Sequence, residues 1–565
     1  MTRRSASAGR RLAVVCAHVL ALVGLTACVA IPTEGSVTAG DGEVREQDRV
    51  VVLAQGPQAD ADPVGIVEGF LLAAGTEVTG DFEVTREFLS ADERAEWDPG
   101  AGTVVASQRK VEQTGEAQVT VSLTVTAKVD AEGRFVEAPA DAVETLRYEL
   151  VQDARGDWRI SHAPDVLVVD SRRFASQFRA ASVYFLTPDR EMLVPEVRWF
   201  RDRDRSVATS VVRALLAGPS PWLHDAVTSA LPAGAVLKPE AVSVEQGVAE
   251  LALEPARAVL DADRGLLLAQ LEASLRPLGV ATLHVRAGAA GALLEGTATD
   301  LPIPGSDELE ILVDGGTLAL GEGAPTAVDG VRAVTGARPG APARSPDGTV
   351  RVALADPSTL VTVPVGDSPQ RVLLSGGSLV APSVDRFGWV WTARSAVPGR
   401  LDVVRTDGTL VEVTAEWLEG RTVDAVRVSR DGTRIAIVSR GTDGTTLDVA
   451  GIVRDDARTP QTIGEAVAAG AALTPTASVV WVDEVTLGVL SDGEAGPTPY
   501  LVPVSGTSSP LPAVADATSL VADRGLRTVH VVTAGGDLLR LQGGTWVEVP
   551  GVTGMLTVTG AAFPG

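Results

Sequence analysis

The stretch SPDGTVRVAL at residues 345–354 decides the fold of the C-terminal part of this chain. A Ser-x-Asp-Gly turn precedes a run of β-branched and aliphatic residues, and the same order returns in SRDGTRIAIV at residues 429–438. SVDRFGWVW at residues 383–391 reads as a third copy, so the serines are spaced by 38 and 46 residues. Propeller blades repeat every 40 to 50 residues or so.

Further blade starts are expected near residues 478–487 and 519–530. The turn motif alone indicates only β-hairpins, and therefore an all-β domain of any kind. Its regular recurrence favours a β-propeller of five to seven blades over residues 311–565.

The preceding segment, residues 181–310, alternates strand and helix patterns. A strand at 181–186, the turn Thr187-Pro188-Asp189 and a returning strand at 192–200 come first. Ser206 is the expected N-cap of a helix that Gly218-Pro219 ends. A strand at 248–253, a helix at 264–278 and a strand at 281–286 then predict a βαβ unit, and so an α/β middle module.

Residues 63–180 predict an N-terminal α+β module. Helical patterns at 63–75 and near 82–97 precede strand patterns at 118–128, 144–152 and 158–162. This order suggests a curved antiparallel sheet beside the helices.

The first 62 residues predict export and lipidation. Arg3, Arg4, Arg10 and Arg11 precede an apolar run at 12–24, which is shorter than the roughly 20 residues of a spanning helix. The sequence LTAC at 25–28 then forms a lipobox, so residues 1–27 are the expected signal peptide. Cys28 is expected to carry S-diacylglycerol and an N-acyl chain such as palmitate, because several chains together anchor a protein stably. The alternatives are an ordinary secreted protein and a buried core cysteine. Residues 28–62 are expected to form a flexible polar tether between the lipid and the first domain.

Composition limits the classes of partner. The net charge is −25, and removing the signal peptide would take away four arginines and no acid, which argues against nucleic acid and anionic lipid surfaces as partners. The only other cysteine, Cys16, lies in the signal peptide, so no disulfide is expected. Only three of the 48 basic residues are lysines, a bias typical of high-G+C genomes such as those of actinobacteria.

Residues that could carry chemistry are scattered, and we expect no catalytic site, metal or cofactor. The histidines His162, His224, His284 and His530 show no zinc-ligand spacing, and no nucleophile motif or calcium loop occurs. Asp347, Asp385 and Asp431 occupy turns where aspartate bonds its own backbone. We expect core packing for Trp389 and Trp391, and Trp199-Phe200 and Trp222 could mark an exposed contact patch.

Several ordered motifs of the middle segment resemble the GerMN domain, also called the sporulation and spore-germination module. They are YFL at 184–186, LVPEVR at 193–198, LLAGP at 215–219, LPAG at 231–234 and VAELAL at 248–253. Together with the lipobox, GDWRI at 156–160, the propeller repeats and AFPG at 562–565, the chain resembles the LpqB family of actinobacterial lipoproteins.

This resemblance implies an accessory lipoprotein on the outer face of the cell membrane. Its expected partner is the ectodomain of the MtrB sensor histidine kinase, through which it would influence the MtrA–MtrB two-component system, envelope homeostasis and division. Two alternatives stay open: a cell-wall binder that contacts peptidoglycan through the GerMN-like module, and a propeller hydrolase acting on glycans.

Overall fold

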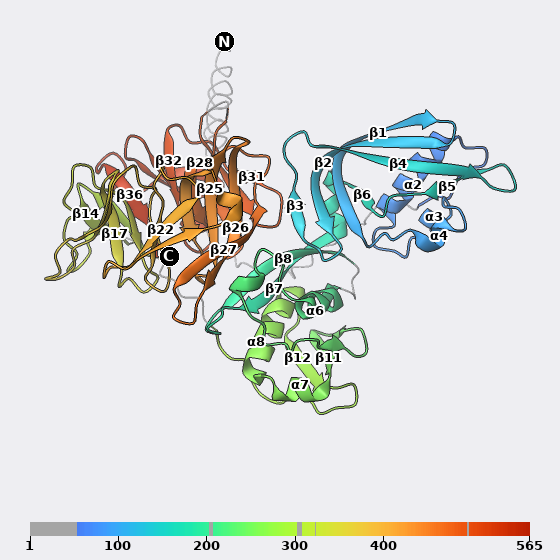
Figure 1. Cartoon of the computed structure of the whole chain (residues 1–565), viewed down its shortest axis with the longest axis horizontal. Coiled ribbons are helices and arrows are strands. Elements are labelled where there is room, and N and C mark those ends of the chain that lie inside the picture. The colour runs from blue at the N-terminus through green and yellow to red at the C-terminus, as the bar shows by residue number, and fades with distance from the viewer. Residues whose placement is uncertain (1–53, 203–206, 302–307, 322–323, 494–495, 565) are drawn as a thin grey trace, which may run out of the picture. The chain divides into compact units, whose positions relative to one another are not determined.

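A computed structural model describes residues 54–202, 207–301, 308–321, 324–493 and 496–564 (Figure 1). Cys28, the expected signal peptide, most of the expected tether and the expected N-cap Ser206 lie outside these residues. Within them, no helix combines the length and the apolar character needed to cross a membrane.

The N-terminal domain packs helices on a mixed six-stranded sheet. Helix α2 begins after Asp62, whose carboxylate accepts a hydrogen bond from the Gly65 N–H (2.7 Å), and Phe70 and Leu71 lie on its buried face. The sheet order is β5-β4-β2-β1-β6, with β3 on the edge of β2. The elements are α2 (Pro63–Thr76), α3 (Glu83–Arg86), α4 (Glu93–Glu96), β1 (Gly102–Gly115), β2 (Gln118–Asp130), β3 (Phe135–Glu137), β4 (Val143–Gln152), β5 (Trp158–His162), β6 (Leu167–Asp170) and α5 (Ser171–Gln177).

The expectation of a purely antiparallel sheet is wrong at one edge. Strand β6 pairs with β1 in parallel, with Thr103 opposite Leu167. Between β1 and its parallel partner β6 the chain forms β2, β3, β4 and β5, and a connection of that length allows parallel pairing, whereas a tight hairpin does not.

The middle domain contains a separate hairpin and a βαβ unit. Strands β7 (Phe178–Leu186) and β8 (Leu193–Arg201) form the two-stranded hairpin. Strands β11 (Val248–Glu254) and β12 (Thr282–Ala287) pair in parallel, which confirms the βαβ expectation. Ala249, Leu251 and Leu253 are buried in the same hydrophobic core as Leu267 and Leu271 of helix α8 (Arg264–Leu275). The remaining elements are α6 (Val207–Ala217), β9 (Val236–Leu237), β10 (Ser243–Glu245), β11 (Val248–Glu254), α7 (Ala256–Asp261), α8 (Arg264–Leu275) and β12 (Thr282–Ala287).

The C-terminal domain is a propeller of six four-stranded sheets in the described residues. The last strand pairs with β13 near the start of the domain, so the final residues complete the first blade and close the ring. In ring order the blades are β15 (Thr326–Ala327), β14 (Gly316–Leu320), β13 (Leu309–Val313) and β36 (Val558–Ala562); β16 (Gly340–Arg344), β17 (Arg351–Asp356), β18 (Thr359–Thr362) and β19 (Val372–Ser375); β20 (Ser383–Val384), β21 (Val390–Thr392), β22 (Arg400–Val404) and β23 (Leu410–Thr414); β24 (Thr422–Val428), β25 (Arg434–Gly441), β26 (Gly444–Arg454) and β27 (Pro460–Ala468); β28 (Pro475–Trp481), β29 (Thr486–Ser491), β30 (Thr498–Pro503) and β31 (Ser509–Pro510); and β32 (Ala517–Val521), β33 (His530–Thr533), β34 (Leu538–Gln542) and β35 (Thr545–Glu548).

The Ser-x-Asp-Gly repeats lie between the first and second strands of their blades, and one copy is shifted from the expected register. Ser345 and Ser429 start their turns in the same way: the backbone N–H of each donates across the turn, to the Val350 and Arg434 carbonyls, and the side-chain oxygen of each accepts the N–H of that same residue. In the third copy Asp385, and not Ser383, does both: its N–H donates to the Trp389 carbonyl (3.0 Å) and its carboxylate accepts the Trp389 N–H (2.9 Å). The Asp385 carboxylate takes the place of the serine hydroxyl in this turn. The structural counterpart of Ser345 and Ser429 is therefore Asp385, two residues after the expected Ser383.

Candidate functional site: the hairpin docked on the propeller

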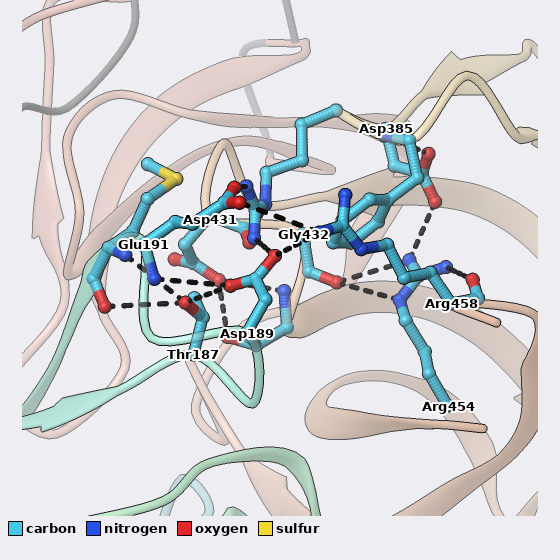
Figure 2. A network of polar contacts seen from close by, with 12 residues as sticks. Thr187, Asp189, Glu191, Asp385, Asp431, Gly432, Arg454 and Arg458 are labelled. Atoms are coloured by element: carbon cyan, nitrogen blue, oxygen red, sulfur yellow. Dashed lines mark hydrogen bonds and ion pairs between the residues drawn. The ribbon is translucent and has the colours of Figure 1, made fainter. Parts of the chain in front are cut away.

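The tip of the β7–β8 hairpin is held against the propeller by a network of ion pairs (Figure 2). Arg386, in a blade turn, pairs with Asp189 and contacts Glu191 at 3.1 Å. Arg458, on the next blade, lies 3.5 Å from Glu191 and 3.9 Å from Asp189. The Asp189 and Arg386 side chains are about one-tenth exposed, so their attraction is only weakly screened by solvent.

The hairpin turn itself places these carboxylates. The Thr187 hydroxyl donates to the Asp189 carboxylate (2.6 Å), and the Thr187 N–H donates to the Met192 carbonyl (3.0 Å). Arg190 takes a left-handed conformation with φ of 60° to complete the turn. Burial would raise the pKa of Asp189, but the Thr187 hydroxyl and Arg386 together lower it, so the carboxylate stays ionised.

Beneath the hairpin, Arg454 and Asp385 form a buried pair that joins two blades. Arg454 Nη2 lies 2.6 Å from the Asp385 carboxylate and also donates to the Gly432 carbonyl (3.1 Å). Trp391 donates its indole N–H to the same carboxylate (2.9 Å). The Phe387 ring has the Arg386 and Arg454 guanidinium carbons 4.3 and 4.7 Å from its centroid, an arrangement that favours cation–π attraction.

Asp431 and Arg434 extend this network to the hairpin backbone. Arg434 Nε lies 3.2 Å from the Asp431 carboxylate, and Arg434 Nη1 donates to the Pro195 carbonyl on β8 (3.3 Å) and to the Glu484 carbonyl (2.6 Å). Both side chains are almost fully buried. Burial alone would raise the pKa of Asp431, but Arg434 and the Thr433 hydrogen bonds lower it.

The three turn aspartates therefore have the backbone-bonding role expected from the sequence, and two of them have a second one. Asp347, Asp385 and Asp431 each accept a hydrogen bond from the backbone N–H two residues further on. Asp385 and Asp431 are in addition partners of buried arginines. Sequence patterns did not reveal Arg386, Arg454 and Arg458, because their partners lie on other blades or in another domain.

The expected exposed aromatic patch is wrong. Trp199 packs between Phe135 and Phe174 of the N-terminal domain, with ring centroids 5.5 and 4.9 Å away, and donates its indole N–H to the Ser505 carbonyl of the propeller (2.9 Å). Trp222 packs against a propeller core cluster, and its carbonyl accepts the Gly451 N–H (3.0 Å). Phe200 is packed against the middle domain's own core. Trp199 and Trp222 therefore join domains, because burial of their apolar surface in these contacts is favourable.

The N-terminal domain also contacts the propeller directly. Both carboxylate oxygens of Glu137, on β3, accept hydrogen bonds from Ser508, one from its N–H (3.0 Å) and one from its hydroxyl (2.7 Å). A cavity of about 240 Å³ lies beside this contact, and its lining includes Phe135, Pro195, Trp222 and Val504. Because the lining comes from all three domains, the cavity depends on their docking.

The four histidines of the described residues lie on different helices and strands. His162, His224 and His284 are exposed, and the last occupies strand β12. His530 is buried, which lowers its pKa to about 4. Across the described ranges, no group of three or more His, Cys, Asp or Glu side chains is arranged to hold a metal ion. Trp389 and Trp391 are buried in the propeller core, as predicted.

Three family models match the chain in order. The N-terminal domain of lipoprotein LpqB matches residues 56–175, the sporulation and spore germination model matches 182–319, and the lipoprotein LpqB beta-propeller domain matches 315–557. These matches agree with the three domains seen in the structure.

Curated relatives carry the same description. Lipoprotein LpqB of Cutibacterium acnes is 26% identical over 444 residues, covering 72% of this chain and 74% of the relative. Those of Bifidobacterium longum and Streptomyces coelicolor are 28% and 30% identical, covering 47% and 42% of this chain. These last two alignments span 49% and 42% of the relatives' own lengths.

Proposed function

Since this chain belongs to the LpqB family of lipoproteins, we propose that it is anchored through Cys28 on the outer face of the cell membrane and binds the ectodomain of a sensor histidine kinase. Binding would modulate a two-component system of the MtrA–MtrB kind. The role is that of an accessory protein without catalysis.

The docking of the three domains supports this proposal. The ion pairs at Asp189 and Glu191 join the middle domain to the propeller, and Glu137 joins the N-terminal domain to it. Loops from the docked domains can then present one composite surface. Loops carried on a fixed scaffold suit the recognition of a folded protein partner.

The hydrolase alternative finds little support in the turn carboxylates. A glycosidase needs a general acid whose pKa is raised, beside a second carboxylate. The pKa of Asp431 is lowered, and Asp385 accepts hydrogen bonds from Arg454 and Trp391. Their geometry supports a structural role for both.

The test is binding by the full, membrane-extracted protein to two immobilised ligands, a purified kinase ectodomain and peptidoglycan sacculi. We expect retention on the ectodomain for the wild type and for Arg527→Gln, which removes one exposed propeller charge. Arg386→Gln should bind more weakly, because it loosens the docked hairpin. Retention on sacculi with none on the ectodomain would replace this proposal with cell-wall binding.

A further inference from the structure

A small cavity of about 40 Å³ lies at the axis of the propeller. All six blades contribute to its lining, through residues on or beside their innermost strands, among them Ala343, Ser383, Arg427, Trp481, Leu520 and Ala562. A cavity of this size has room for a few water molecules or one monatomic ion.

Arg427 brings a positive charge to this cavity. Its Nη1 donates to the Val426 carbonyl (2.7 Å) on its own strand β24 and to the Ala381 carbonyl (3.2 Å) beside the inner strand of the neighbouring blade. Burial lowers its pKa to about 10, so the guanidinium is still protonated at neutral pH. Among the residues that the structure describes, no acidic group contributes to this shift.

Other arginines near the axis differ from Arg427 in having carboxylate partners. Arg344, on β16, lies 3.1 Å from Glu310, and Arg430 lies 2.9 Å from Asp523. In the described part of the chain, no carboxylate oxygen lies within 4.0 Å of the Arg427 nitrogens. The Arg427 side chain is partly buried, and removing a cation from water costs free energy unless a counter-charge or hydrogen-bond acceptors replace that water, which neutral carbonyls do only in part.

A second polar group lines the same cavity. The Ser383 side chain is buried, and its oxygen accepts the Val428 N–H (3.1 Å), which leaves the hydroxyl proton available to donate. A guanidinium and a hydroxyl both donate hydrogen bonds, so together they suit an anion.

We propose that the propeller axis binds one small monovalent inorganic anion of the chloride class, beside the Arg427 guanidinium and within the cavity that Ser383 lines. One uncompensated guanidinium matches one negative charge. The bound anion would bridge the third and fourth blades, which carry Ser383 and Arg427. The site is independent of the proposed partner binding.

Crystals of the full chain soaked in sodium bromide provide the structural test. We expect one anomalous peak on the propeller axis in the wild type and in Arg527→Gln, and none in Arg427→Gln. Water alone at this position in the wild type would overturn the proposal.

Thermal unfolding in solution provides the second test. Replacing gluconate by chloride at constant ionic strength should raise the melting temperature of the wild type and of Arg527→Gln by about 1–2 °C. Arg427→Gln should show no such rise. An equal rise in Arg427→Gln, or a bromide peak without any chloride effect, would mean an adventitious ion only. If Arg427→Gln fails to fold, the two wild-type measurements still decide the proposal.

Discussion

Asp347 and Asp431 hold the same position in two blade turns, but their surroundings differ. Each accepts the N–H of a threonine two residues on, at 3.1 and 2.8 Å. Asp347 is exposed and bonds only its own turn, whereas Asp431 is buried against Arg434. The sequence alone would give both the same role, because the partner of Asp431 becomes visible only in the folded blade.

We predict that Asp431→Asn lowers the free energy of unfolding by about 3–5 kcal/mol, since it leaves the buried Arg434 without a counter-charge. Asp347→Asn should cost about 1 kcal/mol, the scale of one local hydrogen bond. Urea denaturation at pH 7 measures both losses, and equal losses would contradict the role of Arg434.

The pH dependence of the first loss follows from the direction of the shift. The pKa of Asp431 is lowered in the folded state, so its contribution is present above the unfolded value of 3.8 and is lost as the pH falls through the folded pKa. The difference between wild type and Asp431→Asn should therefore be constant from pH 5 to 7 and shrink in acid.

His530 gives a second pH-dependent prediction. Burial lowers its pKa to about 4 in the folded state, against 6.5 for the free side chain. Between these two values His530 is protonated in the unfolded chain but neutral in the folded chain. The free energy of unfolding is therefore highest above about pH 6.5 and falls as the pH drops from 6.5 to 4. The loss should be on the order of 3 kcal/mol. In the His530→Asn variant the free energy of unfolding should change less between pH 6.5 and 4. An unchanged slope in this pH range would mean that other groups cause the loss.

At the scale of elements, Gly451 and Gly464 form a matched pair beside Trp222. A Cβ at Gly451, on β26, would lie 2.9 Å from the Trp222 carbonyl oxygen and 2.7 Å from the Ala226 Cβ. A Cβ at Gly464, on β27, would lie 3.6 Å from the same oxygen, an ordinary contact. The first position requires glycine because two domains approach each other there.

We therefore expect Gly451→Ala to cost about 1–3 kcal/mol and to loosen the contact between the middle domain and the propeller, whereas Gly464→Ala should be tolerated. Thermal unfolding and limited proteolysis at the domain junction measure the two effects. Similar behaviour of both variants would show that the junction can shift to accept a methyl group.

Periodicity predicts elements well where one face is buried and poorly elsewhere. The helix expected at residues 63–75 is α2 (Pro63–Thr76), and the strand expected at 158–162 is β5. Strand β1 was missed because its second half is exposed on both faces, so its polar residues show no alternation. Its backbone pairs with β2 all the same.

At the scale of the whole molecule, the order of domains could be predicted but their contacts could not. Signal, helix and strand patterns are local in sequence, whereas the Arg386–Asp189 and Trp199–Ser505 contacts join residues roughly 200 and 300 positions apart. Aromatic residues such as Trp199 and Trp222 look alike in a sequence whether they meet solvent, another domain or a partner. Only the fold distinguishes these cases.

The proposed membrane anchor leads to a prediction for the molecule as a whole. An accessory protein tethered in the same bilayer as a kinase meets its ectodomain at a high effective concentration, so weak contacts suffice for binding. Replacing Cys28→Ala removes the proposed lipid site, and the only other cysteine, Cys16, lies in the proposed signal peptide. The variant should therefore leave the detergent phase in a partitioning assay.

A secreted version without the lipid should also restore signalling far less than the lipidated protein at an equal level, although its docked domains are unchanged. A kinase reporter in cells that lack the native protein measures this difference, and overexpression of the secreted version should narrow it, because added concentration replaces proximity. Full restoration at equal level would show that the contacts are strong enough without the anchor, and that Cys28 serves only localisation.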